Sequence, residues 1–307
     1  MRLGSRCRST VGIAAMVATA ALTAGEAGAA PAPCAQWTAE TVASGYGVLE
    51  NLAFDGRGNV LLSESSLTGA SGAIKRLGAG GHRSVAVANV SSPGGIVVDG
   101  GTAYFNVGNA MASGLGSRTD GTIEALNLTT GARRTVARGL TMPNGLARLP
   151  GGDFVVSRDI GSAAVTTLTR VSATGRTTGV TSSLTSTNGL AYDTTRQRLV
   201  VSTTFNPATV IAAVDARGRV TRRVTVPGYG PLNSADDLTV GPDGVAYVTL
   251  NAAGRIVRVD LDSGRSCTIA SGLITPSSVR FGAGPGWDSR SLYVTSFLGT
   301  LTRLTPR

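Results

Sequence analysis

The sequence predicts an all-β protein, a six-bladed β-propeller, and three observations carry that prediction. An apolar triplet that follows a turn recurs six times, at intervals of 44, 50, 44, 48 and 41 residues. A second run of β-branched and aromatic residues follows each triplet, and no segment after the N-terminal region shows helical periodicity. A lone strand near the N-terminus matches a strand missing at the C-terminus. Four strands repeated six times form the pattern of a six-bladed propeller.

The strands can be assigned in order from composition. The first strands carry triplets that begin at Leu52, Ile96, Leu146, Leu190, Leu238 and Val279. The second strands are expected at 60–62, 103–105, 154–156, 199–201, 246–248 and 292–294. Third strands are recognisable at 74–77, 168–171, 256–259 and 301–304, and fourth strands at 84–88, 134–137 and 266–270. All are short runs of the type that favours strands.

The two ends of the chain complement each other. Residues 39–45 read like a fourth strand with no first three, whereas the last unit stops at Arg307 after three strands. We expect the N-terminal strand to complete the sixth blade, because a closed ring leaves no unpaired sheet edge.

The first 29 residues have the pattern of an export signal. Arg2, Arg6 and Arg8 precede an apolar run over 11–22, and small residues at 27–29 form a cleavage pattern. The apolar run is shorter than the roughly 20 residues that span a bilayer, which favours a cleaved signal peptide. An uncleaved membrane anchor is the alternative. We therefore expect a signal peptide over 1–29, a propeller over 30–307, and a secreted or cell-envelope protein without stable membrane insertion.

Composition excludes two classes of protein. With 42% hydrophobic and 15% charged residues, the chain is not intrinsically disordered. Its net charge is +10, but the basic residues are scattered without a stripe, so a nucleic-acid partner is not expected. We expect a monomer.

Removal of the signal would discard Cys7 and leave Cys34 and Cys267 in an oxidising compartment. A disulfide between them is the natural expectation, with free thiols or an intermolecular bridge as alternatives. Cys34 precedes the N-terminal strand and Cys267 lies in the fourth strand of the fifth unit, so the bridge would join neighbouring blades at the closure.

Candidate functional residues occur two places before each triplet. The loop that enters a first strand is nearest the propeller axis, so these residues should form a ring: Glu50, Gly94, Asn144, Asn188, Asp236 and Ser277. Four carry carboxylate or amide oxygens, the ligands that Ca²⁺ takes, and Asp237 adds a fifth. No thiolate or imidazole accompanies them, so zinc and copper are not expected. Alternatively, each is a local turn residue, as in the common Asn-Gly turn.

A second row on the same face should come from the loops after the second strands. Its members are Glu64, Asn106, Asn109, Arg158, Asp159, Phe205, Asn251 and Phe297. Arg158 and Asp159 are candidate substrate contacts, with an exposed ion pair as the alternative.

The ring segments LENLAFD, PNGLA, TNGLAY and ADDL, which contain Glu50, Asn144, Asn188 and Asp236, resemble the axial motifs of the gluconolactonase and regucalcin (senescence marker protein) propellers. Paraoxonases and strictosidine-synthase-like proteins are more distant relatives. The resemblance implies Ca²⁺, or another hard divalent cation, held by Glu50, Asn188 and Asp236, with Asn144 a further ligand or substrate contact. It also implies that the cation polarises the carbonyl of a lactone substrate and that Asp236 acts as the catalytic base in its hydrolysis.

The expected function is therefore an exported calcium-binding propeller, with metal-dependent hydrolysis of a small lactone or ester. The alternative is a non-catalytic extracellular propeller that binds a protein or an envelope glycan, with the ion serving stability. The sole histidine, His82, falls between outer strands, so a Ser-His-Asp triad is not expected. The family often has an arginine where Met142 stands here.

Overall fold

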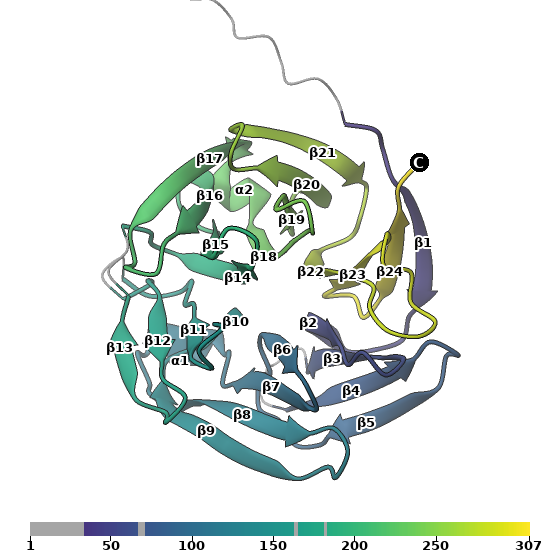
Figure 1. The fold of residues 1–307 in the computed structure, drawn as a ribbon, viewed down its shortest axis with the longest axis vertical. Helices are drawn as coiled ribbons and strands as arrows, with labels where there is room; N and C mark the ends of the chain where they lie inside the picture. Colours follow the sequence, from purple (N-terminus) through teal and green to yellow (C-terminus); the bar gives the residue numbers. More distant parts are fainter. Residues whose placement is uncertain (1–33, 67–70, 163–164, 181–182) are drawn as a thin grey trace, which may run out of the picture. The chain divides into compact units, whose positions relative to one another are not determined.

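The computed structural model describes residues 34–66, 71–162, 165–180 and 183–307, which fall within one compact unit. Their strands form six antiparallel four-stranded sheets arranged as blades around an axis (Figure 1). The predicted six-bladed propeller is confirmed. The predicted signal peptide, residues 1–29, lies outside the described residues.

Each blade is a meander that starts near the axis and ends at the rim. Blade 1 contains β2 (Val48–Phe54), β3 (Asn59–Ser65), β4 (Gly72–Gly78) and β5 (Arg83–Val87). Blade 2 contains β6 (Ile96–Asp99), β7 (Thr102–Val107), β8 (Gly121–Asn127) and β9 (Arg133–Leu140). Blade 3 contains β10 (Leu146–Arg148), β11 (Phe154–Val156), β12 (Thr169–Val171) and β13 (Thr177–Gly179).

The remaining blades follow the same order. Blade 4 contains β14 (Thr187–Asp193), β15 (Arg198–Thr203), β16 (Ala208–Val214) and β17 (Val220–Tyr229). Blade 5 contains β18 (Ala235–Val240), β19 (Ala246–Leu250), β20 (Arg255–Asp260) and β21 (Arg265–Ser271). Blade 6 contains β22 (Pro276–Phe281), β23 (Leu292–Ser296), β24 (Leu301–Thr305) and β1 (Thr38–Ala43).

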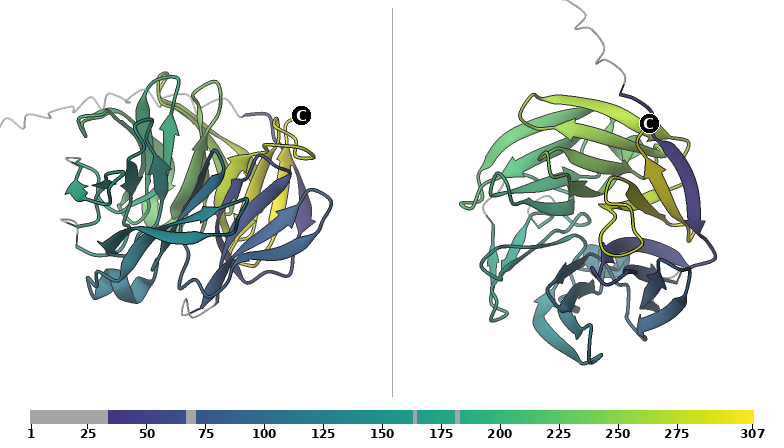
Figure 2. Two further views of the ribbon diagram at one scale, coloured as in Figure 1. Left: turned by 60° about the horizontal axis from the view of Figure 1, so that its bottom comes forward. Right: turned by 45° about the vertical axis from the view of Figure 1, so that its right-hand side comes forward.

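The ring closes as the sequence predicts, because β1 supplies the outer strand of blade 6. It pairs antiparallel with β24, in a register that places Thr38 opposite Thr305 and Thr41 opposite Thr302. Figures 1 and 2 show the purple N-terminal strand beside the yellow C-terminal strands from different directions. The backbone groups at the outer edge of β24 are thereby paired.

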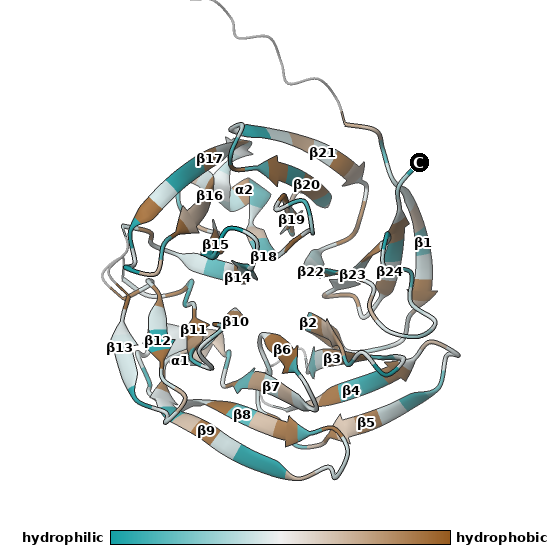
Figure 3. Ribbon diagram, in the orientation of Figure 1, coloured by the Kyte–Doolittle hydropathy of each residue, from teal (hydrophilic) through white to brown (hydrophobic). Residues whose placement is uncertain are grey.

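The core lies between neighbouring blades. One buried cluster joins Val200 and Ile211 of blade 4 to Leu238 and Val248 of blade 5. The second strand β15 is buried throughout, because blades cover both of its faces. Hydrophilic and hydrophobic segments alternate along the outer strands β5, β9 and β17 (Figure 3). Burial of apolar surface between blades is therefore the main stabilising term.

In the part of the chain that the structure describes, two short helices interrupt the strands. Helix α1 (Met111–Leu115) lies between β7 and β8, and α2 (Gly230–Asn233) lies between β17 and β18. With five and four residues, both are too short to produce a helical period in the sequence. Within the described segments, no helix is long and apolar enough to cross a membrane.

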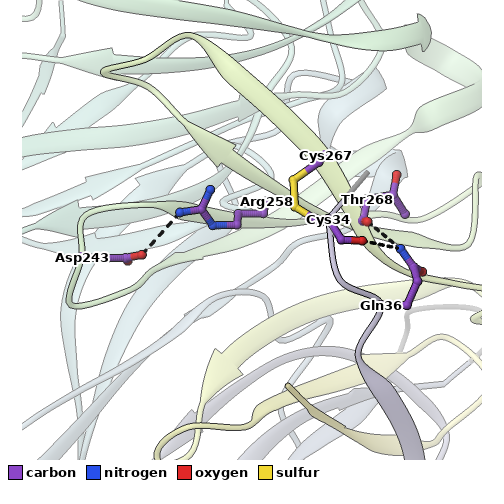
Figure 4. Close-up of a disulfide and its surroundings, with 6 residues drawn as sticks. All are labelled: Cys34, Gln36, Asp243, Arg258, Cys267 and Thr268. Carbon is purple, nitrogen blue, oxygen red and sulfur yellow. Dashed lines mark hydrogen bonds and ion pairs between the residues drawn. A yellow bond between two sulfur atoms is a disulfide. The ribbon is translucent and has the colours of Figure 1, made fainter. Parts of the chain in front are cut away.

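The predicted disulfide is confirmed. Cys34 and Cys267 are bonded, with their Cα atoms 5.6 Å apart, and join the segment before β1 to β21 of blade 5 (Figure 4). Hydrogen bonds secure the same seam: the Gln36 side chain donates to the Thr268 carbonyl at 2.8 Å, and Trp37 N–H donates to Ile269 O at 2.7 Å. The bridge thus anchors the strand that closes the ring.

Replacement of both cysteines, Cys34→Ser with Cys267→Ser, should lower the free energy of unfolding by about 2–5 kcal/mol, because the unfolded chain gains the freedom that a long loop closure removes. Urea unfolding of the oxidised protein measures the loss. Reductant should lower the stability of the wild type to that of the variant, and equal stability of oxidised wild type and variant would contradict the prediction.

Candidate functional site on the propeller axis

A cavity of about 630 Å³ opens on the axis, and we call it the axial cavity. Four of the six ring residues line it: Glu50 of blade 1, Asn144 of blade 3, Asn188 of blade 4 and Asp236 of blade 5. Asn144, Asn188 and Asp236 are buried, whereas Glu50 keeps part of its surface exposed. The structure thus brings together side chains that are far apart in the sequence.

Irregularities in the first strands aim these side chains at the axis. The pairing register of β2 with β3 shifts between Leu49 and Asn51, which leaves Glu50 outside the regular ladder. Similar shifts occur around Asn188 in β14 and Asp236 in β18. A β-bulge bends its strand and redirects a side chain, so these breaks turn the ring residues inward.

A left-handed residue precedes the ring residue by two places in blades 2 to 6. These residues are Ser92, Met142, Ser186, Ser234 and Thr275, with φ angles of 41°, 43°, 50°, 47° and 44°. The conformation is uncommon for residues other than glycine and concentrates at functional sites. The carbonyls of Ser186 and Ser234 then accept the N–H groups of Thr204 and Asn251, both at 2.9 Å. In blades 4 and 5, the residues just before the first strand are thereby hydrogen-bonded to the loop after the second strand of the same blade.

A set of hydrogen bonds between neighbouring blades fixes the backbone of the ring, and we call it the axial belt. In five blades, a side chain at the end of the second strand donates to the ring carbonyl of the next blade. The pairs are Ser63 to Gly94 (2.6 Å), Asn106 to Asn144 (2.8 Å), Ser157 to Asn188, Ser202 to Asp236 (2.6 Å) and Thr249 to Ser277 (2.9 Å). The hydroxyl of Ser277 completes the circle by donating to Leu49 O at 2.6 Å.

The glycines of the two Asn-Gly pairs serve close packing. Neither Gly145 nor Gly189 has a positive φ. A Cβ on Gly145 would lie 2.3 Å from the Asn188 carbonyl oxygen, and one on Gly189 would lie 2.6 Å from the Asp236 carbonyl oxygen. Only glycine permits that approach of backbone to backbone, so these glycines are not the residues of a turn that requires positive φ.

Three carboxyl groups share the axial cavity: Glu50, Asp236 and Asp159. Burial and the charges of Asp159 and Asp237 raise the pKa of Glu50 to about 7. Burial, and then the charges of Glu50 and Asp237, raise the pKa of Asp236 well above its ordinary value. Burial raises the pKa of Asp159 to about 6. Each shift has the sign expected of buried carboxylates that repel one another.

Amide side chains face these carboxylates. Asn109 donates to Glu50 Oε1 at 3.0 Å, and hydrogen bonds from Asn144 and Asn188 lower the pKa values of Asp159 and Asp236 respectively. The carbonyl oxygen Oδ1 of Asn188 and the Oδ1 atom of Asp159 are buried without a hydrogen-bond partner. Buried polar atoms normally have one, so the cavity floor has oxygen atoms available to a ligand.

These donors fit a hard divalent cation. Carboxylate and amide oxygens are the ligands of Ca²⁺, and a cation would relieve the repulsion between Glu50 and Asp236. Within the described residues, no three His, Cys, Asp or Glu side chains form a metal-binding cluster by themselves. Binding at this floor therefore requires the oxygens of Asn144 and Asn188 as well.

Asp237 lies differently from its neighbour Asp236. Its Oδ2 atom accepts hydrogen bonds from Asn51 at 2.7 Å and Ser278 at 2.5 Å, and forms an ion pair with Arg280 at 2.7 Å. It does not line the axial cavity, although its Oδ1 atom is buried without a partner. Its role as a ligand stays a prediction, and its contacts link blades 1, 5 and 6.

The two predicted substrate contacts have different surroundings. Asp159 lines the axial cavity. Arg158 does not; its guanidinium donates to Ile160 O at 2.8 Å and to Gly114 O at 2.6 Å, which holds α1. In the second row, Asn109, Phe205, Asn251 and Phe297 line the cavity, whereas Glu64 and Asn106 do not. The ring residues Gly94 and Ser277 also lie outside its lining.

Sequence patterns missed several features of the site. Helix α1 supplies Met111 and Leu115 to the cavity wall, and nothing in its five residues indicates a helix. The left-handed residues and the donors of the axial belt were also not identified. A recurrent Ser, Thr or Asn at the end of each second strand is the signal that could have revealed the belt.

In the presence of a chelator, the free energy of unfolding should fall as pH rises. The pKa of folded Glu50 is about 7 against an ordinary 4.5, so folding favours its protonated form. That contribution is complete below pH 4.5 and is lost as pH rises through about 7. Glu50→Gln should flatten the profile and raise stability at about pH 8 by about 1–3 kcal/mol, measured by urea unfolding.

Glu40→Gln is the matched control, because Glu40 is exposed on β1 and pairs with Arg303. It should leave the pH profile unchanged. If Glu50→Gln and wild type have the same profile, the carboxylates do not repel one another in the folded protein.

Comparisons with known proteins agree with this fold. Residues 152–297 match the family model described as the SMP-30/Gluconolactonase/LRE-like region. A search of curated protein sequences finds no match to the chain.

Solved structures share the fold over nearly the whole length. A protein assigned as a gluconolactonase is 19% identical, with a TM-score of 0.68 over 90% of this chain and 94% of the other. The gluconolactonase XC5397 of Xanthomonas campestris is 18% identical, with a TM-score of 0.66 over 88% and 90%. Virginiamycin B lyase of Staphylococcus aureus is 11% identical, with a TM-score of 0.58 over 89% and 99%. The resemblance is confirmed: this chain is a six-bladed β-propeller similar to the SMP-30/gluconolactonase group.

Proposed function

We propose that this protein is a metal-dependent hydrolase of a small lactone or a related carboxylic ester, exported to the cell envelope or beyond. The single observation that carries the proposal is the convergence of Glu50, Asn144, Asn188 and Asp236, from four blades, on one cavity floor. The fold alone does not carry it, because a gluconolactonase and a lyase share the architecture. The predicted export signal over residues 1–29 is the reason for proposing this location.

Glu50, Asn144, Asn188 and Asp236 would hold Ca²⁺ or another hard divalent cation. When bound, the cation supplies Lewis-acid polarisation of the substrate carbonyl and stabilises the developing oxyanion. The unpartnered Oδ1 atom of Asn188 and the two facing carboxylates support this assignment.

A carboxylate of the chain would transfer the proton of the reaction. Asp236 is proposed as the base that takes a proton from the attacking water as its oxygen bonds to the carbonyl carbon. The carbon–oxygen bond of the ester then breaks, and the proton passes to the departing alkoxide, so that a hydroxy acid or an acid and an alcohol result. Asp159, in the same cavity, would orient the substrate.

Asp236→Asn should lower kcat/KM for lactone hydrolysis about 100-fold or more, because an amide cannot accept the proton. The measurement is calcium-dependent hydrolysis across a panel of lactones and esters. Asp99→Asn, which removes an exposed carboxylate paired with Arg148, is the control and should keep full activity. Full activity of Asp236→Asn would remove this residue as the base. Chelator-sensitive melting without any hydrolysis would favour the binding alternative.

A calcium titration of stability should distinguish the roles of the adjacent residues Asp236 and Asp237. Saturating Ca²⁺ should stabilise the wild type by about 3 kcal/mol at a hundredfold excess over its dissociation constant, and Asp236→Asn should lose that gain. Asp237→Asn should lower the melting temperature with or without Ca²⁺, because Arg280 is left without its buried partner, yet keep the calcium-dependent shift. Loss of the shift in Asp237→Asn alone would instead make Asp237 the ligand.

A further inference from the structure

The topology of the blades fixes which connections lie on the side of the molecule that carries the axial cavity. Each blade is an antiparallel meander, so the connection after its second strand and the connection after its fourth strand lie at the same end of the sheet. Connections of both kinds line the axial cavity, as Phe297 after β23 and Ser234 before β18 illustrate. We call this side the cavity face, and the side with the other connections the opposite face.

Exposed apolar side chains are concentrated on the cavity face. Among the described residues, the large apolar side chains that are exposed are Val42, Val85, Met111, Leu115, Val165, Phe205, Tyr229, Leu232, Ile274 and Leu298. All except Val42 and Val85 lie in a connection of the cavity face or at the strand end beside one. Leu232 is 70% exposed, Ile274 65% and Leu298 62%. Such a concentration on one face is typical of an interaction surface.

Charged side chains have the opposite distribution. In the described residues of the cavity-face connections, they are Arg118, Asp120, Arg158 and Asp159. Arg118 pairs with Asp120 at 3.8 Å, whereas Arg158 and Asp159 are buried. The connections of the opposite face carry Asp55, Arg57, Asp153, Arg176, Arg196, Asp215, Arg217, Arg219, Asp243, Asp262, Asp288 and Arg290. The cavity-face connections therefore present apolar side chains and little exposed charge.

The exposed apolar side chains come from separate places around the axial cavity. Met111 and Leu115 of α1 and Phe205 after β15 line the cavity itself. Farther from it, Leu232 lies in α2, Ile274 in the connection before β22 and Leu298 in the connection after β23, and none of these three lines the cavity. Figure 1 shows α1 and α2 at separate positions around the axis. The cavity thus opens among apolar side chains from several blades.

A lipid surface fits this arrangement better than a protein partner does. A protein interface requires a contiguous, closely packed core, whereas a fluid lipid surface accepts each side chain separately and binds more tightly as more apolar area enters it. Tyr229, which is 56% exposed at the end of β17, is of a residue type enriched where apolar and aqueous phases meet. The described cavity-face connections contain no cluster of basic residues of the kind that binds anionic lipids. A surface without net charge is therefore the matching one.

We propose that the cavity face docks on a lipid surface without net charge, such as a zwitterionic membrane. Leu232, Ile274 and Leu298 enter the lipid, and the axial cavity opens toward it. The protein lies on the surface, since no described helix can cross a membrane, and the charged opposite face stays in water. The docking does not rest on the proposed hydrolysis, although it would bring lipid-soluble esters to the cavity.

The test measures flotation of the protein with vesicles of phosphatidylcholine. Residues 31–307 form one compact unit, so a chain of residues 30–307 can be used. The predicted signal is left out because its apolar run over 11–22 would itself bind lipid. Binding should be the same in 0.1 M and 1 M salt, because it does not depend on charge.

A triple variant, Leu232→Ser with Ile274→Ser and Leu298→Ser, should lower the partition constant at least about 100-fold, since each side chain that enters the lipid contributes up to about tenfold. Val85→Ser is the matched control, because Val85 is 52% exposed but lies on the outer strand β5. It should bind as the wild type does. None of the four residues lines the axial cavity, so the variants leave the proposed metal site intact.

A tryptophan at one of these positions reports which face touches the lipid. The added fluorescence of Leu298→Trp should shift to shorter wavelength on vesicles and be quenched by brominated phosphatidylcholine, whereas that of Val85→Trp should do neither. Absence of vesicle binding, or binding that the triple variant retains, would overturn the proposal. A dimer in the absence of lipid that the triple variant dissociates would also overturn it, because the face would then bind a second copy. No substrate is present, so these outcomes are independent of the proposed hydrolysis.

Discussion

One hydrogen bond, repeated around the axis, is the constraint on which the site depends. In five blades a side chain at the end of the second strand donates to the ring carbonyl of the following blade, and Ser277 completes the circle. The bond joins elements that are remote in sequence and gives buried backbone carbonyls a hydrogen-bond donor. Because Ser157 and Ser202 also accept the N–H groups of Gly145 and Gly189, each hydroxyl fixes two blades at once.

The belt holds the backbone near the axis through the same kind of hydrogen bond in five blades and leaves the ring side chain free to differ. Gly94 and Ser277 occupy ring positions and contribute packing and hydrogen bonding. Glu50, Asn188 and Asp236 occupy equivalent positions and face the axial cavity. A repeated scaffold can therefore carry an asymmetric site, which explains how one architecture serves proteins of different activity.

The cavity floor is electrostatically unfavourable in the absence of a ligand. Burial and mutual repulsion raise the pKa values of Glu50, Asp236 and Asp159, and the described lining holds no basic side chain against them. Left-handed residues such as Thr275 add backbone strain beside the cavity. Strain and charge repulsion are tolerated here because the blade interfaces are apolar and extensively buried. This pattern is typical of a binding or catalytic site rather than of a purely structural channel.

The sequence by itself determined the fold. The spacing of the apolar triplets, the strand composition and the unmatched N-terminal strand predicted six blades and the closure through β1, because strand periodicity and turn residues are local properties. Position in the repeat also predicted that Glu50, Asn144, Asn188 and Asp236 would meet at the axis. Tertiary structure decided the rest. The sequence predicted both Asp236 and Asp237 as metal ligands, and only the bulge in β18 and the partner Arg280 show that their side chains lie differently. Likewise, only packing on Met142 and Ile160 shows that α1 forms an apolar wall, since a contact between distant segments depends on how the blades are placed around the axis.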